Sequence, residues 1–283
     1  MVRAMHTSLV SPAPGSATPV GTLLREWRQR RRLSQLDLAL DADISTRHLS
    51  YVETGRAAPS RAMVLHLAEQ LDVPLRERNT LLTAAGYAPI YRERGLNDPA
   101  LRAAREAVEL VLRAHEPNPA LAVDRHWNLI SHNQPVLLLL QGVPPELLQP
   151  PLNVLRLSLH PRGLAPKIVN LAAWRNHLFE RLRHQIAVSA DPVLATLLEE
   201  LQSYPAPADT EPHEVFDASA VAVPLQMRTT AGVLSFISTI TVFGTPVDIT
   251  LSELAVETFF PADAATAQAL RHMSDGQAVQ LQP

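Results

Sequence analysis

The sequence predicts an α+β protein, in which an all-α, five-helix module precedes a PAS-like antiparallel sheet with helices on one face. Three observations support this fold class. Apolar residues at helical spacing run through 19–86, strand-like stretches occur at 119–133 and 221–261, and a segment rich in helix breakers at 86–99 separates the two parts. A chain of 283 residues is also long enough for two domains.

Composition indicates a cytoplasmic protein without a membrane span. The chain has no cysteine, which excludes disulfides and cysteine-ligated metal sites and fits a reducing compartment. The aliphatic run at 136–140 is bounded by Gln134 and Gln141 and is too short to cross a bilayer. Residues 1–18 are rich in Ser, Pro and Ala and lack a signal-peptide pattern, so we expect a disordered tail there. Residues 276–283 are expected to form a C-terminal tail.

The charge of the chain is unevenly distributed. A formal net charge of −3, taken alone, argues against nucleic-acid binding. Residues 19–61, however, hold eight arginines against five acidic residues, and the acidic surplus lies from residue 99 onward. A basic N-terminal domain joined to an acidic C-terminal domain would orient the protein on a polyanion such as DNA. This pattern therefore favours a DNA-binding domain at the N-terminal end, called the head below.

Residues 33–56 have the pattern of two short helices joined by a tight turn. The apolar residues expected on their inner faces are Leu33, Leu36, Leu38, Ala39, Ile44, Leu49 and Val52. Ser34 and Ser45 stand at the two N-cap positions, and Gly55 ends the second helix. Further helices are expected at 20–32, 60–71 and 75–85. The second helix of the pair carries small and hydrogen-bonding side chains, which is typical of a helix that reads the DNA major groove.

The same stretch resembles the Xre, or phage Cro/C1 repressor, class of helix-turn-helix domains. The combination SQ-x-x-LA at 34–39 and L-x-x-x-E-x-G-R at 49–56 carries the resemblance, which covers about a quarter of the chain. It implies a lambda-repressor-like fold and double-stranded DNA as the partner. It also implies that Arg28 and Glu53 form an internal ion pair.

The resemblance assigns roles to residues on and around the second helix. The predicted DNA-binding set is Gln35, Ser45, Thr46, Arg47, Ser50, Tyr51 and Arg56. Gln35 and Arg56 are expected to contact phosphates, whereas Thr46, Arg47 and Tyr51 are expected to face base edges. The alternative is that Arg47 and Tyr51 are solvated surface residues.

The segment 87–99 is expected to link the two domains. Its glycines and prolines interrupt any helix, but its tyrosines and aliphatic residues offer apolar anchors, so we expect it to pack on one or both domains. An amphipathic helix should follow from Ala100 to about Ala114. That helix is a candidate for the lever between the domains or for a dimer contact.

The remaining domain, 100–275, mixes helices and strands. A hairpin is expected over 119–133 with its turn at 124–126, and residues 136–140 fit either a helix or a strand. Helices are expected at 164–188 and 192–201, with a Pro-rich loop at 204–212. Strands at 221–229, 233–243 and 247–261, with turns at 231–232 and 244–246, form an antiparallel meander. Two strands, then helices, then three strands is the order of a PAS-like sensor with a cavity between sheet and helices.

The whole chain beyond the tail resembles Xre-type regulators with a C-terminal MmyB-like ligand-binding domain. The segments that carry the resemblance are LRERNTLLTAAGYAPIY, PNPALAVDRHWNLISHN, LSLHPRGLAPKIVNLAAWRNHLFERL and ELAVETFFPAD. The resemblance implies a PAS-like sensor and a small apolar ligand, since at least some members hold a fatty-acid-like molecule.

The sequence predicts a ligand site beside the expected helix 164–188. Its core stripe is Ile168, Leu171, Leu178, Leu182 and Ile186. A neighbouring stripe of Asn170, Trp174, His177 and Arg181 would place an aromatic platform and two cationic groups at a pocket mouth. The alternative is that Trp174 belongs to the core while His177 and Arg181 are solvated. Hydroxyl residues on one face of the strand 233–243 would leave room for a ligand.

Enzymatic and metal-site patterns are weak in this chain. The histidines show no His-Glu-x-x-His spacing, and His177 and His184 lie two helical turns apart. No P-loop, Gly-x-Ser-x-Gly or Gly-x-Gly-x-x-Gly motif is present, and Lys167, the single lysine, has no persuasive serine partner. We therefore expect no catalytic residues, no metal site and no cofactor.

The sequence as a whole predicts a one-component transcription regulator that works as a homodimer and senses an apolar small molecule. The main alternative is a DNA-binding regulator whose C-terminal domain only dimerises or recruits a protein partner, and a small, empty cavity would favour it. A DNA-associated hydrolase is a remote third possibility. The operator, the sign of regulation and the identity of the effector are not encoded in any recognisable pattern.

Overall fold

A computed structural model gives the fold of residues 18–205, 223–242 and 248–280. The chain divides into two units between Ile90 and Tyr91, within the expected linker, and each unit is described by itself. Several expected features lie wholly or partly outside the described residues: the tail 1–18, the loop 204–212, the start of the strand 221–229, the turn 244–246 and the end of the tail 276–283.

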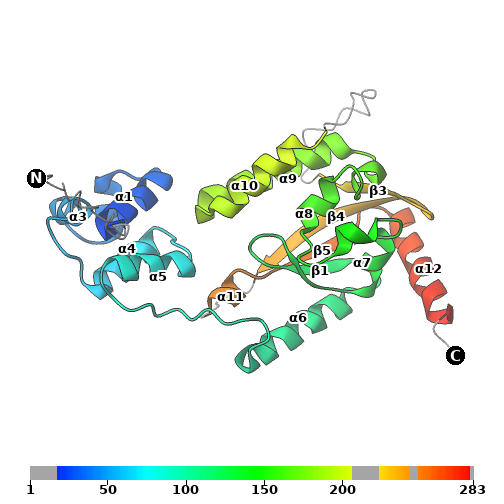
Figure 1. The fold of residues 1–283 in the computed structure, drawn as a ribbon, viewed down its shortest axis with the longest axis horizontal. Helices are drawn as coiled ribbons and strands as arrows, with labels where there is room; N and C mark the ends of the chain where they lie inside the picture. Colours follow the sequence, from blue (N-terminus) through cyan, green and yellow to red (C-terminus); the bar gives the residue numbers. More distant parts are fainter. Residues whose placement is uncertain (1–17, 206–222, 243–247, 281–283) are drawn as a thin grey trace, which may run out of the picture. The chain divides into compact units, whose positions relative to one another are not determined.

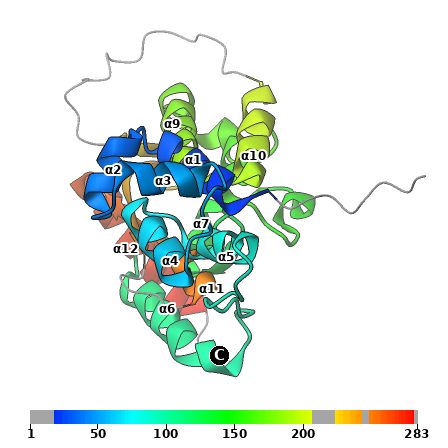
Figure 2. The same ribbon diagram turned by 90° about the vertical axis from the view of Figure 1, so that its left-hand side faces the viewer.

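The first unit is a bundle of five helices, as the sequence predicts (blue to cyan in Figures 1 and 2). The helices are α1 (Val20–Arg30), α2 (Gln35–Asp41), α3 (Thr46–Glu53), α4 (Arg61–Gln70) and α5 (Leu75–Ala84). Ser34 and Ser45 cap α2 and α3, because their hydroxyl oxygens accept hydrogen bonds from the backbone N–H groups of Asp37 and His48. Gly55 follows α3 at a φ of +71°, as expected of a C′ glycine.

Two details of this bundle differ from or add to the sequence pattern. Leu36 was expected inside but is 57% exposed, because it shares the outer face of α2 with Leu40, four residues on. Gly21 lets α1 approach α3 closely, since a Cβ atom there would lie 2.3 Å from the carbonyl oxygen of Val52. The sequence pattern did not single out Gly21.

The second unit contains one five-stranded sheet with the order β2-β1-β5-β4-β3. Its strands are β1 (Ala120–Val123), β2 (Leu129–His132), β3 (Leu225–Thr229), β4 (Gly232–Val242) and β5 (Ala255–Pro261), and all neighbours pair antiparallel. The expected hairpin and meander are therefore both present. The expected strand 247–261 is interrupted, because Asp248 caps a short helix, α11 (Ile249–Ser252), before β5 begins.

Helices cover the sheet on two sides (Figure 1). On one face lie α7 (Gln134–Leu139), α8 (Val154–Leu159), α9 (Leu171–Ser189), α10 (Pro192–Ser203) and α12 (Ala264–Gln280). Their leucines share a core with Leu121, Phe236 and Phe259 of the strands. The helix expected from Ala100 to about Ala114 is present as α6 (Arg102–Ala114), and it packs Val108 and Leu112 against the opposite face. The α+β class is confirmed. Residues 136–140, which fitted either a helix or a strand, belong mainly to the helix α7. Helices were expected on one face of the sheet only, whereas α6 covers the other face as well.

The helix expected at 164–188 begins later, at Leu171. Residues 165–167 form a 3₁₀ turn, and Ile168 bridges to Met227 of β3 instead of continuing a helical stripe. At the other end of the domain α12 reaches Gln280, so the first residues of the expected tail at 276–283 are helical. Among the described residues, no helix has the length and apolarity to cross a membrane.

Candidate DNA-binding surface and ligand cavity

Three residues of the predicted DNA-binding set form a cluster: Arg47 and Tyr51 of α3, and Arg56 just after the helix. Arg47 is exposed, and its Nε donates a hydrogen bond to the hydroxyl of Tyr51 at 3.1 Å. The guanidinium carbons of Arg47 and Arg56 lie 5.3 and 5.9 Å from the centre of the Tyr51 ring. The arrangement holds two positive charges on one aromatic platform, which suits contact with a phosphate backbone or a base edge.

The other residues of the predicted set have varied surroundings. Ser45 is the N-cap of α3, Thr46 begins the helix, and the carbonyl oxygen of Ser50 accepts a hydrogen bond from the hydroxyl of Thr54. Gln35 is half-buried and donates from Nε2 to a carboxylate oxygen of Glu53 at 2.8 Å. DNA contact by all seven residues of the set stays a prediction.

The bundle contains the internal ion pair implied by the resemblance. Arg28 and Glu53 are both more than nine-tenths buried and join α1 to α3. Burial alone would raise the pKa of Glu53, but hydrogen bonds from Arg28 and Gln35 outweigh it and hold that pKa below its usual value. The pKa of Arg28 is raised, chiefly by its hydrogen bond to Glu53. The pair fixes the helix that carries Arg47 and Tyr51.

The second unit contains a cavity of about 80 Å³ beneath α7, α8 and α9. Its apolar lining consists of Leu121, Leu129, Val136, Leu139, Leu140, Leu152, Val154, Leu155, Leu157, Leu164, Leu178, Leu225, Met227 and Phe259. Polar atoms enter the wall from Ser158, Trp174, Arg181 and Glu257. An apolar chamber with a few convergent polar groups is the usual form of a small-molecule site.

The structure brings together three of the four predicted ligand residues. Trp174 and Arg181 line the cavity, and His177 stacks on the Trp174 ring with centroids 5.3 Å apart. Burial and the charge of Arg181 lower the pKa of His177, against the smaller opposing effect of Glu257. Asn170 lies elsewhere: its side chain bonds the backbone of Pro224 and Gln226 and ties the start of α9 to the chain entering β3.

The polar end of the cavity is an ion pair that sequence reasoning missed. Arg181 Nη1 lies 2.8 Å from Oε1 of Glu257, a β5 residue that is only 3% exposed. The guanidinium carbon of Arg181 also lies 4.2 Å from the centre of the Trp127 ring. The signal available in the sequence was Glu257 itself, a charged residue inside the apolar run AVETFF.

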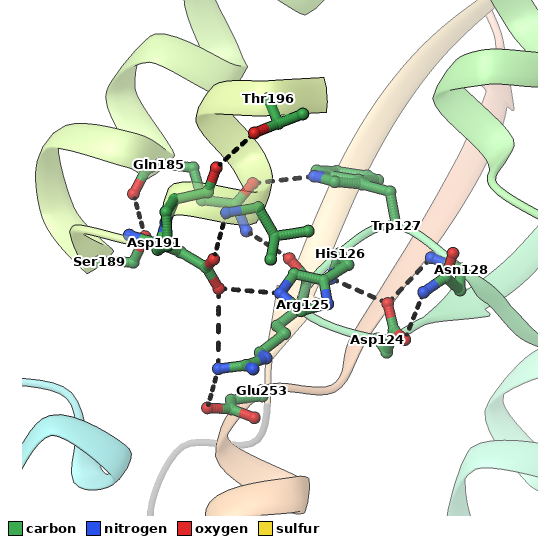
Figure 3. Close-up of polar contacts among 12 residues, drawn as sticks. Asp124, Arg125, His126, Trp127, Asn128, Gln185, Ser189, Asp191, Thr196 and Glu253 are labelled. Atoms are coloured by element: carbon green, nitrogen blue, oxygen red, sulfur yellow. Dashed lines mark hydrogen bonds and ion pairs between the residues drawn. The ribbon is translucent and has the colours of Figure 1, made fainter. Parts of the chain in front are cut away.

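Trp127, which lies against Arg181, also belongs to a polar network around the β1–β2 turn, shown in Figure 3. Its indole Nε1 donates to the Gln185 side chain at 2.8 Å, and Gln185 donates to the backbone of Arg125 at 3.2 Å. Asp191 lies 2.9 Å from His126 Nε2 and 3.6 Å from Arg125. Burial would raise the pKa of Asp191, but hydrogen bonds from His126 and a backbone N–H outweigh it and lower that pKa. The network anchors the hairpin turn to the α9–α10 junction.

Two protein-family models match the chain. The model of the MmyB-like transcription regulator ligand binding domain matches residues 104–273, well over half of the chain. The chain belongs to the family of MmyB-like transcription regulators. A helix-turn-helix domain model matches residues 19–81 of this MmyB-like regulator. The comparison with curated proteins gives no match.

The two matched families define the broad role of this MmyB-like regulator. They are a DNA-binding domain and a ligand-binding domain of transcription regulators, not enzymes. The first match contains the cavity with Arg181 and Glu257, and the second contains α3 with its arginine cluster. Within the described residues, no three His, Asp or Glu side chains are grouped so that they could hold a metal ion.

Proposed function

We propose that this chain is a cytoplasmic, homodimeric regulator of the Xre type that binds specific DNA through α3 and senses an aliphatic, fatty-acid-like molecule through its C-terminal cavity. The observation that carries the proposal is the apolar cavity with one polar end inside the ligand-binding domain. The alternative is a C-terminal domain that only dimerises or recruits a protein partner.

The volume and the lining of the cavity bear differently on these two functions. An apolar cavity of roughly 150 Å³ holds a benzene-sized molecule, so a chamber of about 80 Å³ accepts only a short aliphatic chain as it stands. A longer chain requires the lining leucines to move apart. The small volume favours the alternative, whereas the polar groups gathered at one end of an apolar chamber favour a ligand. Each methylene buried there would contribute about 0.8 kcal/mol.

Dimerisation is proposed through α6. This helix packs one face on the sheet but leaves Leu110 63% and Val111 45% exposed. A second copy is the occupant we infer, because one helix-turn-helix head reads one half-site and two heads about 34 Å apart give useful specificity. The charges beside this apolar strip are self-complementary: in an antiparallel pair with Ala107 level with Leu110 of the partner subunit, Glu106 approaches Arg113 of the partner subunit, and the reverse.

Regulation requires that the ligand favour one arrangement of the two DNA-binding domains over another. A ligand that binds both arrangements with equal affinity does not change their populations. The first measurement is native mass spectrometry of the purified regulator, followed by solvent extraction of any retained molecule. Calorimetric titration of the delipidated protein with fatty acids of increasing chain length then measures affinity directly.

Variants of the cavity wall complete the test. Trp174→Ala and Arg181→Ala should weaken fatty-acid binding at least tenfold, whereas Leu137→Ala, at an exposed residue of α7 outside the lining, should not. Unchanged binding in both wall variants would place the ligand elsewhere. Absence of binding at every chain length would favour the alternative function.

A further inference from the structure

The polar end of the cavity already balances its own charge. The guanidinium of Arg181 is paired with the carboxylate of Glu257 at 2.8 Å, and both side chains are largely buried. The neighbouring ionisable group is His177, four residues before Arg181 on α9, and burial and the Arg181 charge lower its pKa from 6.5. His177 is therefore neutral at pH 7.5, and Arg181, Glu257 and His177 together carry no net charge.

This balance decides which head group fits. A ligand carboxylate placed beside Arg181 would also lie beside Glu257, and the repulsion between two carboxylates is strong in a water-poor site. Such a ligand could displace Glu257 only by leaving that carboxylate buried without its partner, which is costly. An uncharged head group avoids both costs.

Arg181, a residue of the cavity lining, also has a hydrogen-bond donor without an acceptor. Nε of Arg181 is buried and has no hydrogen-bond partner, and no other buried side-chain nitrogen or oxygen in the described part of the chain shares this condition. A buried donor without a partner destabilises the folded state. A carbonyl or hydroxyl oxygen can accept a hydrogen bond from a guanidinium without adding charge.

We propose that the sensor selects aliphatic molecules whose polar head is uncharged when bound, such as an amide, an alcohol or a protonated acid, with the head oxygen accepting a hydrogen bond from Arg181. This inference rests on the proposed ligand-sensing function and narrows its ligand class. A free fatty acid then binds only in its protonated form, and the proton comes from solvent.

The test compares octanoate, octanamide and 1-octanol by calorimetry on the delipidated full chain. At pH 7.5 the amide and the alcohol should bind at least tenfold more tightly than octanoate. From pH 8 to pH 6.5 octanoate affinity should rise up to tenfold per pH unit, because its protonated fraction rises by that factor. The affinities for octanamide and 1-octanol should stay flat over this range and serve as internal controls.

A matched pair of variants tests whether the charge of Glu257 causes the preference for uncharged head groups. Glu257→Gln keeps the side-chain shape but leaves the charge of Arg181 uncompensated, so octanoate should bind at least tenfold more tightly than to the wild type and lose its pH dependence. Glu199→Gln, at an exposed position of α10 outside the cavity lining, should behave like the wild type. If Glu257→Gln fails to fold, the pH dependence of octanoate binding to the wild type is sufficient to test the proposal.

The outcomes separate this inference from the function on which it rests. Octanoate binding that is tighter than octanamide binding and independent of pH would overturn the inference while supporting a fatty-acid sensor. Failure of the acid, the amide and the alcohol to bind at every chain length, shorter chains included, would overturn both.

Discussion

Arg28 and Glu53 meet in a two-point ion pair, with Nε 2.7 Å from Oε1 and Nη2 2.9 Å from Oε2. Nη1 of the same arginine donates to the carbonyl oxygen of Leu33, and Gln35 donates to Oε2 of Glu53. One buried pair thus joins α1, the start of α2 and α3. The orientation of Arg47, the exposed arginine of α3, depends on this junction.

The first prediction concerns the stability of this junction. Replacing Arg28 or Glu53 alone with an apolar residue should lower the free energy of unfolding of the head by about 3–5 kcal/mol, because an unpaired charge stays buried. Replacing both together should cost less than the sum of the two single changes. A double-mutant cycle by thermal unfolding measures the difference, with the exposed Arg183→Ala as control. Strictly additive losses would show that the two residues are not coupled.

The second prediction concerns base reading. Arg47→Ala should weaken binding to the specific operator by about 1–3 kcal/mol and relax its base preference, because an arginine in the major groove binds guanine through two hydrogen bonds. Arg56→Ala should weaken binding to specific and scrambled duplexes alike, since a phosphate contact carries no sequence information. Fluorescence anisotropy on both duplexes separates the roles, and equal losses for Arg47→Ala would reject base reading.

The third prediction concerns the contact between α1 and α3 at Gly21. Gly21→Ala should lower the free energy of unfolding by about 1–3 kcal/mol, because the added methyl group would meet the backbone of α3. Gly95→Ala is the matched control, since a Cβ there meets no atom within 4 Å. A melting temperature unchanged in Gly21→Ala would mean that α1 can shift without cost.

The sequence predicts those parts of the fold that depend on local signals. Ser34 and Ser45 marked the starts of two helices because an N-cap acts within three residues. The hairpin and the antiparallel meander followed from short apolar runs separated by turn residues. Short helices gave the weakest signal. In the seven-residue α2 the spacing alone did not separate the inner Leu38 from the outer Leu36.

The polar end of the cavity was harder to predict because its members are distant in sequence. Arg181 and Glu257 are 76 residues apart, and their contact depends on α9 crossing β5. Asn170 was assigned to a helical stripe, but it precedes α9 and bonds the chain at β3. Helical periodicity identified Trp174 and Arg181 as neighbours, whereas the pairing of Arg181 could come only from the tertiary fold.

The fourth prediction concerns pH. His177 has a folded-state pKa below the 6.5 expected when unfolded, so the unfolded chain binds its proton first as pH falls. Stability from this residue is therefore complete above pH 6.5 and decreases as pH falls below that value. Chemical unfolding at pH 7.5 and 5.5 should show a smaller pH-dependent loss in His177→Asn than in the wild type. His184→Asn, at an exposed position of the same helix, is the control, and identical losses in all three proteins would contradict the prediction.

The last prediction concerns the dimer contact on α6. Leu110→Glu should convert the full chain to a monomer in sedimentation velocity, because it places charge in an apolar strip that a second copy covers. Val193→Glu, at an exposed apolar position on α10, should leave the dimer intact.

A charge exchange tests the antiparallel arrangement of the two α6 helices. Glu106→Arg and Arg113→Glu should each weaken the dimer, since each places like charges opposite one another across the two-fold axis. The double exchange restores opposite charges at both positions and should restore the dimer. A dimer that survives Leu110→Glu would place the interface elsewhere, and failure of the double exchange would reject the antiparallel register. Because two linked heads bind a two-fold operator more tightly than one, loss of the dimer should also weaken operator binding in the same variants.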